Sequence, residues 1–113
     1  MNAELAETLA KSVQVLDQAQ GQIAEIHETI TRTENESLDR HLSTTSKFTL
    51  QIHSASWALS GGTLMLNGTG NTRYEVCFNL VEAASVSANK ISYIEDFGAW
   101  VKRHTDIHLI QNI

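Results

Sequence analysis

The first third of the chain carries the pattern that most restricts how it can fold. Apolar residues recur every seven positions from Leu5 to Ile30. With Leu9 at position a of the heptad, seven of the eight a and d positions are apolar. A repeat sustained over about four heptads is typical of a helix that packs along a partner helix. The pattern therefore predicts one long helix over about residues 2–32, within an N-terminal segment 1–36.

The apolar stripe on this helix predicts contact with a second chain. The alternative is an amphipathic helix that lies on its own sheet. A helix of about thirty residues is roughly 45 Å long, whereas four strands span only about 19 Å, which favours pairing between chains. The small residues Ser12 and Ala19, at successive d positions, would let another backbone approach. The predicted homo-oligomer interface consists of Leu5, Leu9, Ser12, Leu16, Ala19, Ile23, Ile26 and Ile30.

Length and composition indicate one soluble domain. The chain has 113 residues, of which 42% are hydrophobic and 19% charged, as in ordinary globular proteins. No apolar run approaches the roughly 18 residues of a membrane span, and the acidic start Met-Asn-Ala-Glu is unlike a secretory signal. The single cysteine, Cys77, fits a reducing compartment. We therefore expect a cytoplasmic protein that does not bind membranes.

The net charge of −5 is unevenly distributed. Residues 1–46 carry eight acidic and three basic side chains, whereas residues 47–113 carry five of each. An acidic surface repels the nucleic-acid backbone, and no basic stripe offsets it. Nucleic acid is therefore not an expected partner.

From Lys47 the apolar period changes from helical to two. Phe48 and Ile52 share one parity, but Trp57 has the other, so a β-bulge is expected near residues 53–56. The remaining strands and turns of this predicted antiparallel sheet are a turn at 60–62, a strand at 63–66, a turn at 67–71 and a strand at about 72–80.

A second helix is expected near the C-terminus. Ser92 followed by Glu95 has the form of a capping box, and Ile91, Ile94 and Phe97 have helical spacing, which predicts a helix ending near Arg103. Residues 106–113 fit either a fourth strand, which we favour, or a last helical turn. The predicted fold is α+β: a long N-terminal helix, a bent antiparallel sheet of three or four strands, and a C-terminal helix packed on the sheet. Residues 1–113 would form one domain, with the sheet and second helix in 46–113.

His104, Asp106 and His108 form the most suggestive polar cluster. On a strand they would share one face, and two imidazoles with a carboxylate could begin a zinc or iron site. No second group of ligands supports that site, so we interpret the cluster as a solvated edge. No metal and no cofactor are predicted.

Two other patterns are weak indications of chemistry. Cys77 could be a nucleophile if His53, on a neighbouring strand, activated it, but a structural cysteine is the favoured interpretation. Gly68 and Gly70 resemble a phosphate loop but precede a strand, where a hairpin turn is expected instead.

These observations favour a non-catalytic, homo-oligomeric interaction protein that associates through its acidic N-terminal helix. In that case Trp57, Phe78, Phe97 and Trp100 would fill a solid core between the sheet and the C-terminal helix. The alternative is a small-molecule-binding protein or small enzyme, with a pocket between a curved sheet and a covering helix.

Overall fold

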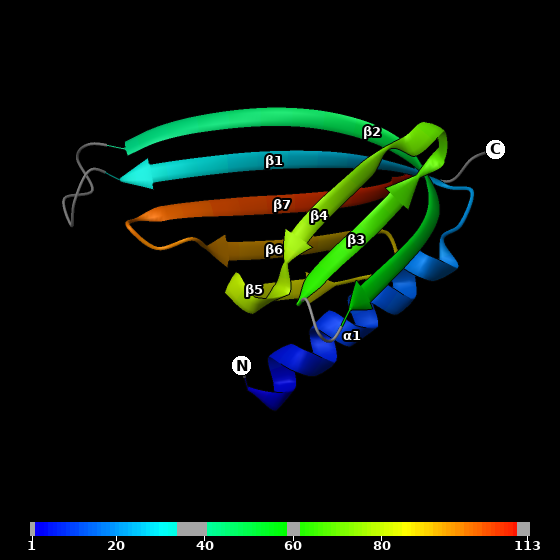
Figure 1. Cartoon of the computed structure of the whole chain (residues 1–113), viewed down its shortest axis with the longest axis horizontal. Helices are drawn as coiled ribbons and strands as arrows, with labels where there is room; N and C mark the ends of the chain where they lie inside the picture. Colours follow the sequence, from blue (N-terminus) through cyan, green and yellow to red (C-terminus); the bar gives the residue numbers. More distant parts are fainter. Residues whose placement is uncertain (1, 34–40, 59–61, 111–113) are drawn as a thin grey trace.

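The computed structural model describes residues 2–33, 41–58 and 62–110. In this part of the chain one helix precedes seven strands, which form a strongly curved sheet (Figure 1). The elements are α1 (Ala3–Gln18), β1 (Ile23–Thr33), β2 (His41–Ala58), β3 (Thr63–Gly68), the 3-10 turn η1 (Thr69–Asn71), β4 (Arg73–Cys77), the 3-10 turn η2 (Phe78–Leu80), β5 (Val81–Val86), β6 (Lys90–Asp96) and β7 (Val101–Ile110).

All neighbouring strands are antiparallel, in the order β4-β3-β2-β1-β7-β6-β5. The 18-residue strand β2 shifts its register between Ile52 and Ser54, which confirms the predicted bulge. A bulge bends and twists its strand. The second half of β2, together with β3 and β4, therefore folds across the sheet in front of β1 and β7 (Figure 1).

The sheet has an inner face, towards β4 and α1, and an outer face. On β1 the even-numbered side chains point inward, and Ala24 and Ile26 are fully buried. Helix α1 covers one end of the inner face, where it packs mainly against β2 and β5. Leu9 and Leu16 are also fully buried there. The core beneath α1 is therefore solidly packed.

The predicted long N-terminal helix is wrong beyond Gln18. Asn2 does cap the helix, since its side chain accepts a hydrogen bond from the Leu5 N–H at 2.7 Å, but the chain turns at Gly21, which has a φ of 89°. Residues 23–33 then form β1, with β-branched residues at many positions, as strands prefer. Apolar residues at 26 and 30 fit both a heptad and a two-residue period, so the repeat continued into the strand by coincidence.

The predicted C-terminal helix is also wrong. Residues 90–110 form the hairpin β6–β7, in which Ile91, Tyr93 and Glu95 alternate inward and are buried. The intervening turn contains Gly98, with a φ of 78°, whose N–H donates to the Asp96 carboxylate at 2.9 Å. The sheet consequently has seven strands rather than three or four.

The remaining sequence predictions are partly correct. Strand β3 and the turn after it lie where the sequence indicated, whereas the expected strand 72–80 is shorter and ends in η2. Strand β5 was not predicted. The favoured last strand is confirmed as part of β7 up to Ile110, and residues 111–113 lie outside the described part of the chain. The predicted turn at 60–62 falls outside it too, except for Gly62.

Candidate functional site

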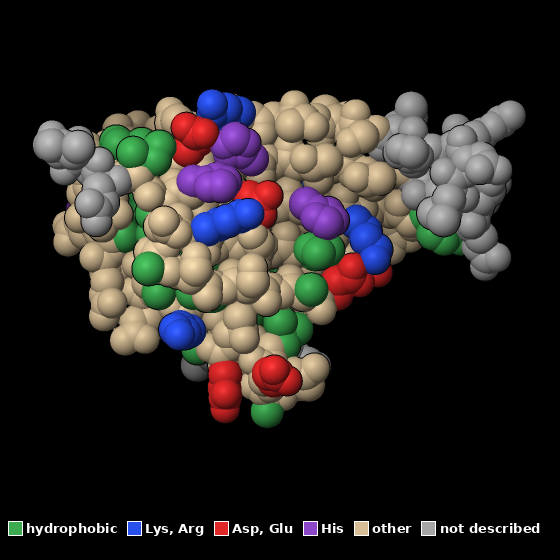
Figure 2. Space-filling view, turned by 180° about the vertical axis from the view of Figure 1, so that it is seen from behind, with side chains coloured by type: hydrophobic (Ala, Val, Ile, Leu, Met, Phe, Trp, Pro, Cys, Tyr) green, Lys and Arg blue, Asp and Glu red, His purple; other side chains and the backbone are tan. Residues whose placement is uncertain are grey.

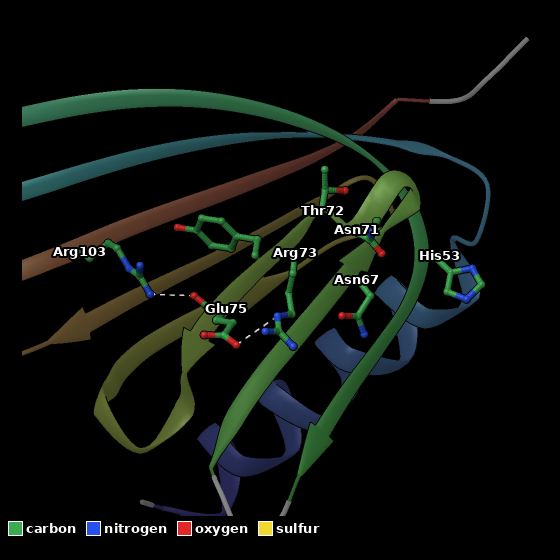
Figure 3. Close-up of a pocket in the computed structure, with 9 residues that line it drawn as sticks. His53, Asn67, Asn71, Thr72, Arg73, Glu75 and Arg103 are labelled. Carbon is green, nitrogen blue, oxygen red and sulfur yellow. Dashed lines mark hydrogen bonds and ion pairs between the residues drawn. The ribbon is translucent and has the colours of Figure 1, made fainter.

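Two cavities adjoin β4, and Tyr74 lines both of them. The smaller, of about 370 Å³, is partly open to solvent and lies between β4 and the inner face of β1 and β2. The larger, of about 830 Å³, is an open groove along β4 that ends at Arg103 (Figure 3). We call the two together the β4 cleft. The smaller cavity is lined by Ile26, Phe48, Thr49, Leu50, Thr72, Arg73 and Tyr74, and the larger by His53, Asn67, Gly68, Asn71, Thr72, Arg73, Tyr74, Glu75 and Arg103.

A buried ion pair within the hairpin β6–β7 also makes hydrogen bonds to β4. The Arg103 guanidinium donates to the Glu95 carboxylate from Nε at 2.7 Å and from Nη2 at 2.9 Å, and the Glu95 side chain is fully buried. Nη2 also donates to the Glu75 carbonyl at 2.9 Å, and the Cys77 N–H donates to Glu95 Oε2 at 2.9 Å. β4 is an edge strand, so these two side chains satisfy backbone groups that a neighbouring strand would otherwise pair.

A second chain of hydrogen bonds forms the floor of the β4 cleft. The Tyr74 hydroxyl donates to Glu28 Oε2 at 2.8 Å, and its oxygen lies 3.0 Å from the Thr105 hydroxyl. Because a carboxylate only accepts hydrogen bonds, the Tyr74 hydroxyl donates its hydrogen bond to Glu28 and accepts one from the Thr105 hydroxyl. Burial, together with the bond to Glu28, raises the pKa of Tyr74 above its ordinary value of 10.0. Tyr74 is therefore a neutral donor at physiological pH.

Arg103 is held in its charged form between two aromatic rings. Its guanidinium carbon lies 5.5 Å from the centre of the Tyr74 ring and 5.6 Å from that of Phe97. Burial lowers the pKa of Arg103, but the hydrogen bonds to Glu95 and the nearby negative groups outweigh burial and raise the pKa overall. Arg103 is thus a fixed cation whose strongest contacts lie within the protein.

Large apolar side chains remain exposed on the inner face of β2 and in the turn between β6 and β7. Phe48 is 44% exposed, Phe97 45% and Trp100 53%. Trp100 also has a φ of 61°, in the left-handed region that costs a bulky residue roughly 1–2 kcal/mol. Exposed apolar groups gathered near a cavity are typical of binding surfaces.

The eight residues of the predicted oligomer interface are divided between α1 and β1. Five of them are buried within their own chain, namely Leu9, Ser12, Leu16, Ala19 and Ile26. Leu5 is partly buried against the core, and Ile23 lies on the outer face of β1. Ile30 is 37% exposed at the uncovered end of the inner face. The structure therefore does not align these residues along one exposed helical face, and association between chains stays a prediction.

His104, Asp106 and His108 all lie on the outer face of β7 but do not converge, because positions i and i+4 of a strand are roughly 13 Å apart. The His108 ring instead contacts that of His27, 5.0 Å away, and Asp106 accepts from the Ser92 hydroxyl at 2.6 Å. Figure 2 shows histidines interspersed with basic and acidic side chains on this face. Within residues 2–33, 41–58 and 62–110, no group of three or more His, Cys, Asp or Glu side chains is placed to hold a metal ion.

The outer face does contain one short charged cluster. Glu25 accepts a hydrogen bond from His27 at 2.8 Å and lies 3.3 Å from the Lys47 ammonium. The bond from His27, reinforced by Lys47, holds the pKa of Glu25 below its ordinary value of 4.5.

His53 and Cys77 are not brought together. Cys77 pairs with Thr63 at one end of β3, whereas His53 follows Ile52, which pairs with Gly68 at the other end. The five intervening steps of strand correspond to roughly 17 Å. The structure therefore does not support a Cys–His nucleophile. Gly68 ends β3 and Gly70 lies in the turn η1 before β4, as expected for a hairpin.

Two carboxylates that lie beside the cleft, Glu28 and Glu95, were missed by sequence reasoning. Glu28 falls within the predicted long helix, and Glu95 was assigned to a helix cap. One signal was available: Glu95 continues the two-residue alternation of Ile91 and Tyr93, which places its carboxylate on the buried side of a strand. An inward carboxylate in a strand requires a partner, which Arg103 provides.

Comparison of the chain with protein-family models, with curated proteins and with solved structures gives no match. Among the described residues, no helix is both long enough and apolar enough to cross a membrane. Function is therefore inferred from the geometry of the β4 cleft.

Proposed function

We propose that this protein binds a small organic molecule in the β4 cleft. The observation that supports the proposal is that one cavity combines an apolar wall, formed by Ile26, Phe48 and Leu50, with the hydrogen-bonded side chain of Tyr74. Ligand sites are typically concave and mainly apolar, with a few polar groups that orient the ligand. The site differs from the pocket expected under a covering helix, because no residue of α1 lines either cavity.

Ligand binding is tested by titrating a fragment library into isotope-labelled protein and following the backbone amide signals. Saturable changes should map to Ile26, Phe48 and Tyr74. Phe48→Ala should weaken binding at least tenfold, since it removes one wall of the smaller cavity. Phe97→Ala is the matched control, because Phe97 is equally exposed but lines neither cavity. A library that leaves the cleft signals unchanged, or hits that bind Phe48→Ala as well as the parent, would overturn the proposal.

A second candidate function is self-association. It is favoured by the exposed apolar side chains of Ile30, Phe48 and Trp100 at the uncovered end of the sheet. The proposed contact is this end of the sheet rather than the helix, whose apolar residues Leu9 and Leu16 are fully buried within the chain. Light scattering should then give at least twice the 12.5 kDa mass of one chain at micromolar concentration, and Trp100→Glu should reduce it. A 12.5 kDa particle at all concentrations would exclude association.

We also propose a cytosolic location. The single cysteine, Cys77, is free and half-buried, which is usual where thiols stay reduced.

A further inference from the structure

The backbone of β4 alternates between its neighbour β3 and a free edge. β4 is the last strand of the sheet and pairs only with β3. At the turn between the two strands, the Gly68 N–H donates to the Thr72 carbonyl at 2.8 Å. In an antiparallel pair, residues bonded in this way alternate with residues whose N–H and C=O groups point in the opposite direction. The N–H and C=O groups of Arg73, Glu75 and Cys77 therefore point towards the free edge.

Side chains satisfy only one half of this edge. The Glu75 carbonyl accepts from Arg103 at 2.9 Å, and the Cys77 N–H donates to Glu95 at 2.9 Å. Figure 3 shows Arg103 on the side of β4 away from β3. In the half nearer η1, no residue of the described ranges bonds to the N–H or C=O of Arg73, or to the N–H of Glu75. Three backbone groups that a neighbouring strand would pair are thus open.

The open half of the edge borders both cavities of the β4 cleft. Thr72, Arg73 and Tyr74 line the smaller and the larger cavity alike, and Glu75 also lines the larger one. A strand added to a sheet lies roughly 4.8 Å from its neighbour. An extended chain that paired with Arg73 would therefore lie within the cleft.

The inward side chains of such an added strand would meet the apolar wall. Side chains directly opposite each other in an antiparallel pair share one face of the sheet. Side chains opposite Thr72 and Tyr74 would thus point towards the inner face, where Phe48, Ile26 and Leu50 line the smaller cavity. The Phe48 ring is 44% exposed and lies 6.1 Å from that of Tyr74. An apolar side chain between these rings would remove apolar surface from water, which favours binding.

The charged residues that line the cleft already have partners within the protein. Arg103 is bonded to Glu95, and the Arg73 side chain lies 3.3 Å from the Glu75 carboxylate. The cleft therefore offers neither an unpaired cation nor an unpaired anion to a ligand. It offers backbone donors and acceptors at strand spacing beside an apolar wall, which is how sheet edges recognise extended peptides.

We infer that the ligand of the β4 cleft is a short peptide that adds to β4 as an antiparallel strand. One peptide residue, opposite Arg73, exchanges two hydrogen bonds with it, and the carbonyl two residues earlier accepts from the Glu75 N–H. The residues on either side of the central one carry apolar side chains towards Phe48. The antiparallel direction matches every other pairing in the described sheet and is slightly more stable than the parallel one. This inference rests on the proposed ligand-binding function and adds the class of ligand.

The test uses the peptide acetyl-Leu-Thr-Leu-amide. In the inferred register its threonine lies opposite Arg73, its acetyl carbonyl faces the Glu75 N–H, and both leucines point inward. The peptide is titrated into isotope-labelled protein, and the exchange of backbone amide hydrogens is followed. At about 90% occupancy, exchange at Arg73 and Glu75 should slow about tenfold, because only the unbound tenth of the protein exchanges. Amides of β5, at the opposite edge of the sheet, should keep their exchange rates.

N-methylated peptides test the backbone pairing without changing any side chain. Methylating the threonine nitrogen removes the donor to the Arg73 carbonyl and should weaken binding by at least about tenfold. Methylating the nitrogen of the first leucine is the matched control, because that N–H would face away from β4. The control peptide should bind within about twofold of the unmodified one, since it keeps all three hydrogen bonds.

A serine peptide tests the apolar wall. Acetyl-Ser-Thr-Ser-amide should bind at least about tenfold more weakly than the leucine peptide, because it buries little apolar surface. Phe48→Ala should reduce this difference. Phe97→Ala, at an equally exposed ring that lines neither cavity, should retain it.

Each outcome decides between the two proposals. If library fragments bind but the leucine peptide does not, the peptide inference is wrong while ligand binding stands. The same holds if methylating the threonine nitrogen has no effect, or if the amides of β5 are slowed as much as those of β4. A protein that alone has the mass of two chains and already slow exchange at Arg73 and Glu75 would show that a second copy occupies the edge, which also overturns the inference. If neither the peptides nor the fragment library changes the cleft signals, both proposals are wrong.

Discussion

Replacing Arg103 with methionine tests whether its ion pair with Glu95 holds the fold together. The variant keeps much of the apolar stem but removes the two hydrogen bonds of 2.7 and 2.9 Å to the carboxylate. Glu95 would remain fully buried, with only the Cys77 N–H as a donor. The Glu75 carbonyl on the edge strand β4 would lose its bond to the guanidinium as well.

The size of the effect depends on whether the unpaired, buried carboxylate stays ionised or takes up a proton. Removing one partner of a buried ion pair costs about 3–5 kcal/mol. A carboxylate can escape that penalty by taking up a proton, which for an ordinary glutamate pKa of about 4.3 costs about 3.7 kcal/mol at pH 7 and about 1 kcal/mol at pH 5. The lost bond to the carbonyl adds about 1 kcal/mol at either pH. We therefore expect Arg103→Met to lower the free energy of unfolding by about 4–5 kcal/mol at pH 7, but only by about 2 kcal/mol at pH 5.

Urea unfolding of the parent and the variant at pH 7 and pH 5, followed by circular dichroism, measures both values. The control is the double variant Arg103→Met with Glu95→Gln, which removes the charge but keeps an acceptor for the Cys77 N–H. The double variant should lose less free energy of unfolding than the single variant at pH 7, and this loss should be the same at the two pH values. A loss below about 1 kcal/mol at pH 7 would refute the reasoning, since it lies well under the usual cost of a broken buried pair. An equal loss at both pH values would refute it too.

Three further predictions concern the core and the outer face. Phe78→Ala should cost about 3–5 kcal/mol by leaving a cavity, whereas Phe97→Ala, at a 45% exposed ring, should cost less than about 1 kcal/mol; equal losses in urea unfolding would contradict this division. Tyr93→Phe should cost about 1 kcal/mol, because the buried Ser12 hydroxyl loses the donor 2.7 Å away, and an unchanged unfolding midpoint would argue against that contact. The pKa of Glu25 is lowered in the folded state, so its stabilisation is present above its ordinary value of 4.5 and is lost as the pH falls through the lower folded-state value. Glu25→Gln should therefore be less stable than the parent at pH 7 and equally stable at the acid end of a pH series, and a difference that grew on acidification would show the sign to be wrong.

The sequence was informative wherever one period dominated. The alternation from Phe48 to Ile52, with its shift of parity, located the middle of β2 and its bulge, but not the start of the strand at residues 41–46. Over residues 23–33 two periods coexisted, since isoleucines at 23, 26 and 30 fit a heptad while the even positions fit a strand. Near Phe97 the helical spacing of apolar residues likewise predicted a helix where the chain forms the hairpin β6–β7. Local pattern alone could not decide, because burial on the inner face of the sheet, rather than intrinsic propensity, selected the strands.

The sequence by itself therefore determined the local features: the Asn2 cap, the bulge in β2, the turn before β4 and the unequal distribution of charge. Only the tertiary structure decided that Glu28, Glu95 and Arg103 meet, because they come from three strands up to 75 residues apart in the chain. Their meeting depends on strand order and register, because β1, β7 and β6 are neighbours in the sheet. The bend in β2 then brings Tyr74 of β4 to Glu28. Periodicity shows which residues share a face of one strand, whereas the contacts between strands are set by pairing over long separations, which no local pattern encodes.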